Sequence, residues 1–286
     1  MTTVSLGRLL YNRGRQTNFA RASDLKHHPF HGGPQAAAWH WLQRVKRASG
    51  ARELLDGPLD SATLEGNLRD LSRFNRWLGG GALSWCALRS ATAGVSAEGP
   101  IALLDVGTGA ADIPRDLLRR ADGMALSLRV TATDVRPEVV ASARARSAGV
   151  KGLVIELGRV GVLDHPDDSF DVVHCSLLMH HLEPDLARQL LAEMGRVARL
   201  SVIVNDLERA GRWWLSAWLM SHLLTGNRYT RHDAPLSVRR AYRATEVKQL
   251  AAAAGLRELA HQTAFPGHRY SIVFAPPADT EAGRDE

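Results

Sequence analysis

The spacing of apolar residues changes near residue 100 and divides the chain into two patterns. Upstream, residues 60–78 repeat apolar side chains every three or four positions, which predicts an amphipathic helix capped by Asp60 or Ser61 and ended by Gly79–Gly81. A second short helix is expected over 82–91. Downstream, short apolar runs alternate with helical stretches. The expected strands are 101–106, 126–134, 153–157, 170–176 and 200–206, and the expected helices are 111–121, 136–147, 184–198, 208–224 and 244–254.

Two further apolar runs close this pattern and determine the fold class. Residues 257–265 and 268–276 flank Pro266–Gly267, and strands joined by so short a turn must be antiparallel. The earlier strands are separated by single helices, which is typical of parallel βαβ units with both faces of the sheet covered. We therefore predict an α/β fold: a doubly wound, mostly parallel seven-stranded sheet, closed by an antiparallel C-terminal hairpin and preceded by N-terminal helices.

Charge is concentrated at the start of the chain. Residues 1–50 hold eight Lys or Arg and one acid, whereas the remaining residues are close to neutral, although the net charge of the chain is +6. The high pI therefore belongs to the leader, and the main body has no charge-based affinity for nucleic acid. The leader lacks the long apolar stretch of a signal peptide, and an organelle-targeting segment is the alternative to a flexible tail.

Cysteine and histidine usage indicates a cytoplasmic protein without a structural metal. The two cysteines, Cys86 and Cys175, suggest no disulfide framework, so a reducing cytosol fits best. The leader also contains a group of histidines that could bind a metal, but no cysteine or carboxylate partner is near them, and we expect no metal. These histidines are His27, His28, His31 and His40.

The stretch "LLDVGTGAADI", residues 103–113, resembles a nucleotide-binding loop but has Asp112 where a dinucleotide fingerprint has its third glycine. In a doubly wound sheet, ligands lie at the carboxyl ends of the strands, which is where Asp105, Gly107, Thr108 and Gly109 fall. Glycines there allow a close approach of backbone N–H groups. A carboxylate before the turn favours a cationic amine over a diphosphate. Asp134 ends the next strand and suits a ribose diol, so the turn indicates S-adenosylmethionine (SAM).

With these residues in place, the chain resembles the class I SAM-dependent methyltransferases over residues 100–276. The resemblance rests on D-x-G-x-G at 105–109, the acid at 134, "DDSFDVVHCSLLMHHLEP" at 167–184 and the closing hairpin. It is strongest to the small-molecule methyltransferases of the ubiquinone/menaquinone type. The stretch from Val204 to Leu256 is similar to bacterial methyltransferases of polyketide or phenolic metabolism.

The resemblance implies a set of cofactor-binding residues. These residues are expected to contact the methionine and sugar, the ribose hydroxyls or the adenine. They are Asp105, Gly107, Thr108, Gly109, Asp134, Val135, Val160 and Cys175. One position departs from the family: the loop before "SFD" usually carries an acid that contacts the adenine edge, and this chain has Arg159 there, followed by Val160. The adenine-edge contact is therefore in doubt, whereas SAM binding as a whole is not.

Three residues are candidates for the chemistry. His181 follows the fourth strand and is expected to be the general base for a hydroxyl acceptor, or else to order the strand–helix turn. Asp206 ends the fifth strand and can orient a histidine, bind substrate or cap a helix. His232 lies in "TRHDAP", read here as a loop that returns over the pocket. Arg239 and Arg240 can bind an anionic group, although exposed arginines are commoner.

The apolar stretch 213–224 is shorter than the roughly 20 residues that a membrane span needs. It can be a core helix, a lid whose Trp214 and Trp218 line an acceptor pocket, or a peripheral membrane contact. The expected organisation is a flexible basic leader (1–50), a helical cap (51–99), a methyltransferase domain (100–276) with a lid or substrate insertion at 207–243, and a disordered tail (277–286).

The sequence therefore predicts an enzyme that transfers a methyl group from SAM to a hydrophobic aromatic, quinol or polyketide-like small molecule, at a hydroxyl or a ring carbon. We expect no nucleic acid as partner. One alternative is a nucleic-acid methyltransferase that grips its substrate with the basic leader. The other is a SAM-binding protein without turnover. The sequence leaves the acceptor and the oligomeric state open.

Overall fold

The computed structural model describes residues 45–57, 60–94 and 99–277. The chain divides into two units, and all described residues belong to the larger one. The predicted leader up to residue 44, with its four histidines, and the tail from residue 278 lie outside the described residues. No helix within the described ranges is both long and apolar enough to cross a membrane.

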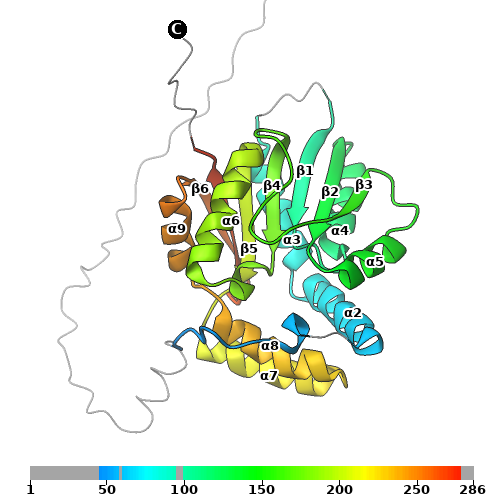
Figure 1. Cartoon of the computed structure of the whole chain (residues 1–286), viewed down its shortest axis with the longest axis vertical. Helices are drawn as coiled ribbons and strands as arrows, with labels where there is room; N and C mark the ends of the chain where they lie inside the picture. The colour runs from blue at the N-terminus through cyan, green and yellow to red at the C-terminus, as the bar shows by residue number, and fades with distance from the viewer. Residues whose placement is uncertain (1–44, 58–59, 95–98, 278–286) are drawn as a thin grey trace, which may run out of the picture. The chain divides into compact units, whose positions relative to one another are not determined.

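Seven strands form one sheet in the order β3-β2-β1-β4-β5-β7-β6 (Figure 1). The first five strands pair in parallel, and β7 pairs antiparallel with both β5 and β6. The predicted doubly wound sheet with its antiparallel C-terminal hairpin is confirmed. The strands are β1 (Ile101–Val106), β2 (Leu128–Asp134), β3 (Leu153–Leu157), β4 (Phe170–Ser176), β5 (Ala198–Leu207), β6 (Arg257–Ala264) and β7 (Arg269–Ala275).

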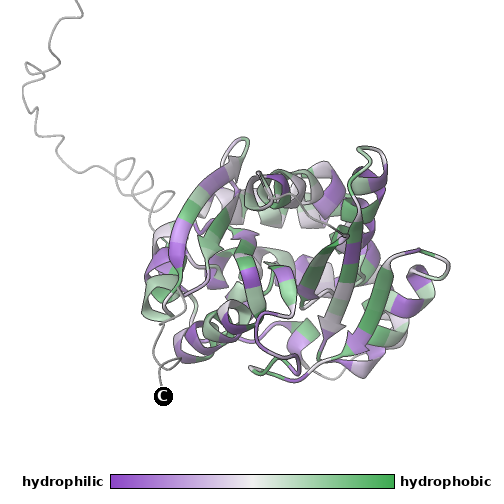
Figure 2. Cartoon of the chain, turned by 90° about the horizontal axis from the view of Figure 1, so that it is seen from above, coloured by the Kyte–Doolittle hydropathy of each residue, from purple (hydrophilic) through white to green (hydrophobic). Residues whose placement is uncertain are grey.

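Helices cover both faces of this sheet. On one face, apolar residues of α3 and α4 pack against alternate residues of the strands, among them Leu103, Val130 and Val172. On the other face, α6 and α9 pack against the residues in between, such as Leu104 and Val173. Figure 2 shows hydrophobic residues along the strands of the sheet, interrupted by hydrophilic ones. The helices are α3 (Gly80–Ala91), α4 (Asp112–Asp122), α5 (Pro137–Arg146), α6 (Pro184–Val197) and α9 (Ala244–Ala253).

Three further helices lie near the carboxyl ends of the strands. They are α2 (Ser61–Trp77), α7 (Gly211–Leu224) and α8 (Arg228–Arg240), and Figure 1 shows them together below the sheet. Asp60 caps α2 by accepting the N–H of Thr63, as predicted. Helix α8 was read from the sequence as a loop. Pro235 lies inside it and, with many polar neighbours, conceals the helix in the sequence.

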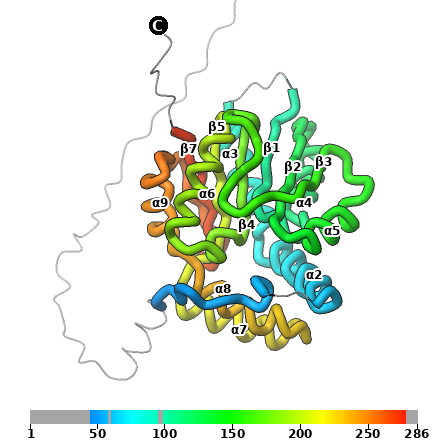
Figure 3. Tube along the Cα trace, viewed as in Figure 1, coloured from blue at the N-terminus to red at the C-terminus, as the bar shows by residue number. Residues whose placement is uncertain are grey.

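A segment before α2 closes the same end of the molecule. Residues 45–57 run beside α8 and contain the short 3-10 helix η1 (Leu54–Asp56) (Figure 3). Asp233 of α8 accepts the N–H groups of Leu54 and Leu55 at 2.8 and 3.0 Å. Arg47 donates to the carbonyl of Leu182 at 2.7 Å. Arg47 is therefore bonded to the core although it lies before residue 50, where the leader was expected to end.

Candidate active site

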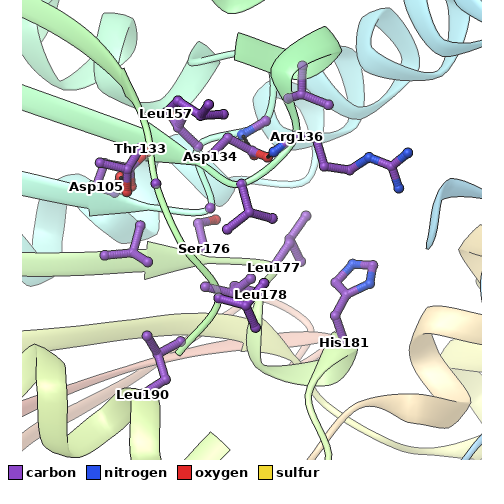
Figure 4. A pocket seen from close by; sticks show the side chains of 18 of the residues that line it. Asp105, Thr133, Asp134, Arg136, Leu157, Ser176, Leu177, Leu178, His181 and Leu190 are labelled. Carbon is purple, nitrogen blue, oxygen red and sulfur yellow. Dashed lines mark hydrogen bonds between the residues drawn. The ribbon is translucent and has the colours of Figure 1, made fainter. Parts of the chain in front are cut away.

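A cavity of about 300 Å³ lies at the carboxyl ends of β1 to β4. Figure 4 shows Asp105, Asp134, Leu157 and Ser176 around it, each from a different strand, with His181 at one side. Seven of the eight residues predicted to bind the cofactor line this cavity. They are Asp105, Gly107, Thr108, Gly109, Asp134, Val135 and Val160.

Cys175 is the exception. Its side chain is fully buried and packs in the hydrophobic cluster beneath α6 and α9. Side chains alternate along a strand, so Cys175 points away from the face that carries Asp105. The next residue, Ser176, lines the cavity instead. The prediction that Cys175 contacts the cofactor therefore has no support from its position.

The glycine turn after β1 leaves room for a ligand. Gly107 has a φ of +70°, and a Cβ there would lie 2.9 Å from the side chain of Leu178. Gly109 has a φ of +55° and nothing within 4 Å of the position of a Cβ, so its backbone is open to the cavity. Thr108 Oγ1 is buried and has no hydrogen-bond partner among the described residues. The turn thus offers a bound molecule the uncovered surface of the backbone at Gly109 and one unused polar group, Thr108 Oγ1.

Asp112 occupies the place of the missing third glycine. It is the first residue of α4 and lines the cavity. Asn75 of α2 donates to its carboxylate at 3.0 Å, yet burial raises the pKa of Asp112 above its ordinary value. A carboxylate at the helix start opposes a diphosphate and favours a cationic amine.

Asp134 is held by the glycine turn that it faces. Its Oδ2 accepts the N–H of Gly109 at 3.1 Å, and its Oδ1 accepts the N–H of Arg136 at 3.1 Å. Burial raises the pKa of Asp134, although these backbone donors oppose the shift. Each carboxylate oxygen keeps a further lone pair, so the side chain can also accept hydrogen bonds from two vicinal hydroxyls of a ribose.

Apolar residues complete the cavity near Asp134. Val135 and Val160 are 46% and 63% exposed and both line it, as expected for surfaces that cover a planar base. Arg159, which replaces the usual acid, forms an ion pair with Asp164, with Nε 2.7 Å from Oδ2. Asp164 also lines the cavity. A carboxylate is thus present on this loop, although not at the position where the family carries it.

Asp105 is fixed by partners that the sequence did not indicate. His174 on β4 lies 2.6 Å from its carboxylate through Nδ1, and the other ring nitrogen of His174 lies 2.9 Å from Ser84 Oγ on α3. Asp105, His174 and Ser84 are all buried. Register explains the contact, because Asp105 and His174 are direct neighbours across β1 and β4.

A second, smaller cavity of about 150 Å³ adjoins the first. Five residues line both cavities: Leu55, Leu71, Asn75, Leu177 and His181. The remaining wall of the second cavity is mainly apolar, with Phe74 of α2 and Met220 of α7 among its members. Its polar groups include Asn67, whose buried Oδ1 lacks a hydrogen-bond partner within the described ranges.

Two adjacent histidines stand at this second cavity. His181, in the 3-10 helix η2 (Met179–His181), lines both cavities, and its Nδ1 lies 3.0 Å from Asp56 Oδ1. His180 is buried, and its Nδ1 lies 2.8 Å from Asp206 Oδ1. Asp206 therefore orients a histidine, as one reading of the sequence predicted, but the histidine is His180. Asp206 itself lines neither cavity.

His232 does not reach either cavity. It lies on α8, its side chain is half exposed, and its Nδ1 pairs with Asp233 Oδ1 at 2.7 Å. Because the segment is a helix and not a loop, neighbouring residues point in different directions. Asp233 faces the second cavity and His232 faces outward. The expected loop is therefore a helix, and the position of His232 gives no support to a role in the chemistry.

The sequence missed Glu53, Asp56 and the role of Arg240. Glu53 is 4% exposed and lines the second cavity, and burial raises the pKa of its carboxyl group. Arg240 is buried, in contrast to the expectation of exposure, and lies 2.6 Å from Asp56 Oδ2. It also donates to the carbonyl groups of His180 and His181 at 3.2 and 2.9 Å. Arg240 thus holds the histidine turn against the N-terminal segment.

Comparison with known proteins supports the geometry. Residues 103–200 match a family described as a methyltransferase domain. No curated protein matches the chain.

Three solved structures share the fold. A SAM-dependent methyltransferase from Aquifex aeolicus is 19% identical, with a TM-score of 0.53 over 76% of this chain and 98% of that one. Human N-acetylserotonin methyltransferase, solved with SAM, is 15% identical, with a TM-score of 0.56 over 77% and 57%. The CMeT domain of the citrinin polyketide synthase is 13% identical, with a TM-score of 0.50 over 62% and 47%.

The residues of the larger cavity fit SAM. The open backbone at Gly109 and the unpartnered Thr108 Oγ1 suit a close ligand, Asp134 suits a ribose, and Asp112 suits an amine. The family match, the fold and this cavity agree. The chain thus contains a methyltransferase domain in the fold of SAM-dependent methyltransferases, and it is a methyltransferase enzyme whose cofactor is S-adenosylmethionine.

Proposed function

We propose that the enzyme methylates a hydrophobic small molecule held in the second cavity, at a phenolic, quinol or polyketide hydroxyl or at a ring carbon. One observation carries the proposal: the second cavity is largely apolar and meets the cofactor cavity at His181 and Leu177. Ligand sites of this kind are mostly apolar, with a few polar groups that fix orientation. Here Asn67, Glu53 and the two histidines are among those groups.

The residues around the second cavity can position and activate an acceptor. When bound, SAM supplies a methyl group on a positively charged sulfur. Holding the two reactants in contact can lower the barrier by roughly 7–11 kcal/mol. Asp56 lies beside Nδ1 of His181, which favours the tautomer with a free lone pair on Nε2. That nitrogen can take the proton of a hydroxyl at the boundary of the cavities.

The solved structures do not identify the acceptor of this chain. They include a methyltransferase of N-acetylserotonin and a domain of a polyketide synthase. At 13–15% identity they share only the fold with this chain. The small-molecule acceptor is therefore inferred from the apolar second cavity of this protein.

Helix α7 has an exposed apolar face, which suggests how a lipid-like acceptor could reach the second cavity. Its side chains Leu215, Leu219 and Leu223 are 47%, 48% and 71% exposed and recur every four residues, which places them on one face. Ala217 and Met220 of the same helix line the second cavity. We infer that α7 rests on a membrane surface while its other face borders the acceptor. Co-sedimentation with vesicles of zwitterionic lipid that L219E abolishes would support this contact, and equal sedimentation of both proteins would refute it.

The acceptor class is tested with a substrate panel. The enzyme is incubated with SAM and separate sets of phenols, quinols and oligonucleotides, and methylated products are detected by mass spectrometry. We expect methylation in the phenol or quinol sets only. Methylation of the oligonucleotides would overturn the proposal. So would the absence of any methylated small molecule from a broad panel when S-adenosylhomocysteine still binds.

A further inference from the structure

Three side chains converge on one point of the second cavity without bonding to one another. Glu53 Oε1 lies 3.9 Å from Nε2 of His180, and Glu53 Oε2 lies 3.8 Å from Nε2 of His181. Each residue offers one atom that could coordinate a metal ion, and these three atoms lie within 4.8 Å of one another. Hydrogen bonds between nitrogen and oxygen span about 2.7–3.2 Å, so these atoms face a shared gap.

The opposite nitrogens of both imidazoles are already held by carboxylates. Asp206 lies 2.8 Å from Nδ1 of His180, and Asp56 lies 3.0 Å from Nδ1 of His181. A proton on each Nδ1 leaves the lone pair of each Nε2 directed toward Glu53. A carboxylate behind a ligating histidine, which fixes its tautomer, is the usual outer support of a metal site.

The charge around this point is negative. Leaving the two imidazoles out of the count, four carboxylates stand against two guanidinium groups. The residues are Glu53, Asp56, Asp206 and Asp233 against Arg240 and Arg269. Five of the six are buried, and Asp56 is partly buried. Part of this charge is already paired, since Arg240 lies 3.6 Å from Glu53 and 2.6 Å from Asp56, and Asp233 accepts two backbone N–H groups. Buried charge that stays unbalanced is costly, and one divalent cation would balance the excess of two carboxylates.

We propose that Glu53, His180 and His181 bind a divalent transition-metal cation of the zinc and cobalt class. Two nitrogens and one carboxylate oxygen suit such ions better than magnesium or calcium, which prefer oxygen ligands. Ligand bonds of about 2.0–2.2 Å require the three side chains to move slightly inward from their present separations. The remaining coordination positions would face the second cavity, which all three residues line.

The use of the cation rests on the proposed function. A divalent cation beside a hydroxyl lowers the pKa of that hydroxyl. The O–H bond then breaks, its electron pair stays on the oxygen, and the proton leaves to solvent. In the metal-free protein, Nε2 of His181 takes that proton instead.

The test is a titration of the chelator-treated full chain with Co²⁺, followed by its visible absorption. A background variant in which His27, His28, His31 and His40 are glutamine removes the imidazoles of the leader. In this background we expect one equivalent of Co²⁺ to bind and to give the intense visible bands of a site with fewer than six ligands. E53Q and H181Q should remove these bands, and D206N should weaken Co²⁺ binding about 10- to 100-fold.

H232Q is the matched control, since His232 also pairs with a carboxylate but lies outside both cavities. It should bind Co²⁺ as the background does.

Binding of S-adenosylhomocysteine, measured on every variant, reports folding and tests the cofactor site separately. If that ligand binds and Co²⁺ gives no bands, or gives bands that E53Q and H181Q retain, the metal site is refuted while the methyltransferase account stands. Bands without acceptor methylation would refute the proposed use alone.

Discussion

Replacing Asp134 by asparagine should weaken the binding of S-adenosylhomocysteine, the product that keeps the ribose of SAM. Both carboxylate oxygens of Asp134 accept backbone N–H groups, from Gly109 and from Arg136. An amide has one oxygen and one donor group. The variant therefore loses one of these backbone bonds as well as the negative charge that faces the ribose.

The size of the effect follows from the kind of bond lost. Hydrogen bonds to a charged group contribute about 1.5–3 kcal/mol. Loss of one such bond to a ribose hydroxyl raises the Kd about 10- to 150-fold. The wild type should also lose affinity on acidification. Burial raises the pKa of Asp134, so its charge disappears at a higher pH than for an ordinary aspartate, whereas the variant should not show this dependence.

Calorimetric titration at pH 7.5 measures the effect. Glu138→Gln is the matched control, because Glu138 is an exposed carboxylate in the first turn of α5 and does not line the cavity. It should bind with wild-type affinity. A Kd of the folded Asp134→Asn protein within threefold of wild type would refute the assignment of Asp134 to the ribose.

Three other predictions concern the two cavities. Burial raises the pKa of Asp112, so folding is less favourable once the pH exceeds that pKa. Asp112→Asn should therefore raise the Tm at pH 7 while lowering the affinity for S-adenosylhomocysteine, and a lower Tm would contradict the reasoning. His181→Ala should reduce turnover about 10²- to 10⁴-fold and leave that affinity within threefold, whereas His232→Ala should keep full turnover. Ala217→Phe places a ring in the second cavity and should raise the KM of the acceptor without changing cofactor binding, so an unchanged KM would place the acceptor elsewhere.

The fold could be predicted because each element carries its own pattern. The strands at the sheet centre are short apolar runs, and the turn residues between them are local signals. Helix α8 was missed because its polar residues and Pro235 resemble a loop, whereas in the structure it packs against α7, α2 and η1.

The sequence revealed the residues of the cofactor cavity better than those of the second cavity. The cofactor residues sit at strand ends next to their own motif, so Asp105 and Asp134 were found. Glu53 and Asp56 reach His180 and His181 only through folding, from a segment with no motif. The prediction for His232 has no support from its position, because the sequence did not show that the segment is a helix whose other face lines the second cavity.

The central claim is that the larger cavity binds S-adenosylmethionine. Calorimetric titration of the purified protein with S-adenosylhomocysteine, with NADH as the control ligand, tests it most directly. We predict one equivalent of S-adenosylhomocysteine bound with micromolar affinity and no heat from NADH. Binding of NADH, or no binding of S-adenosylhomocysteine, would contradict the assignment of the glycine turn and every role derived from it.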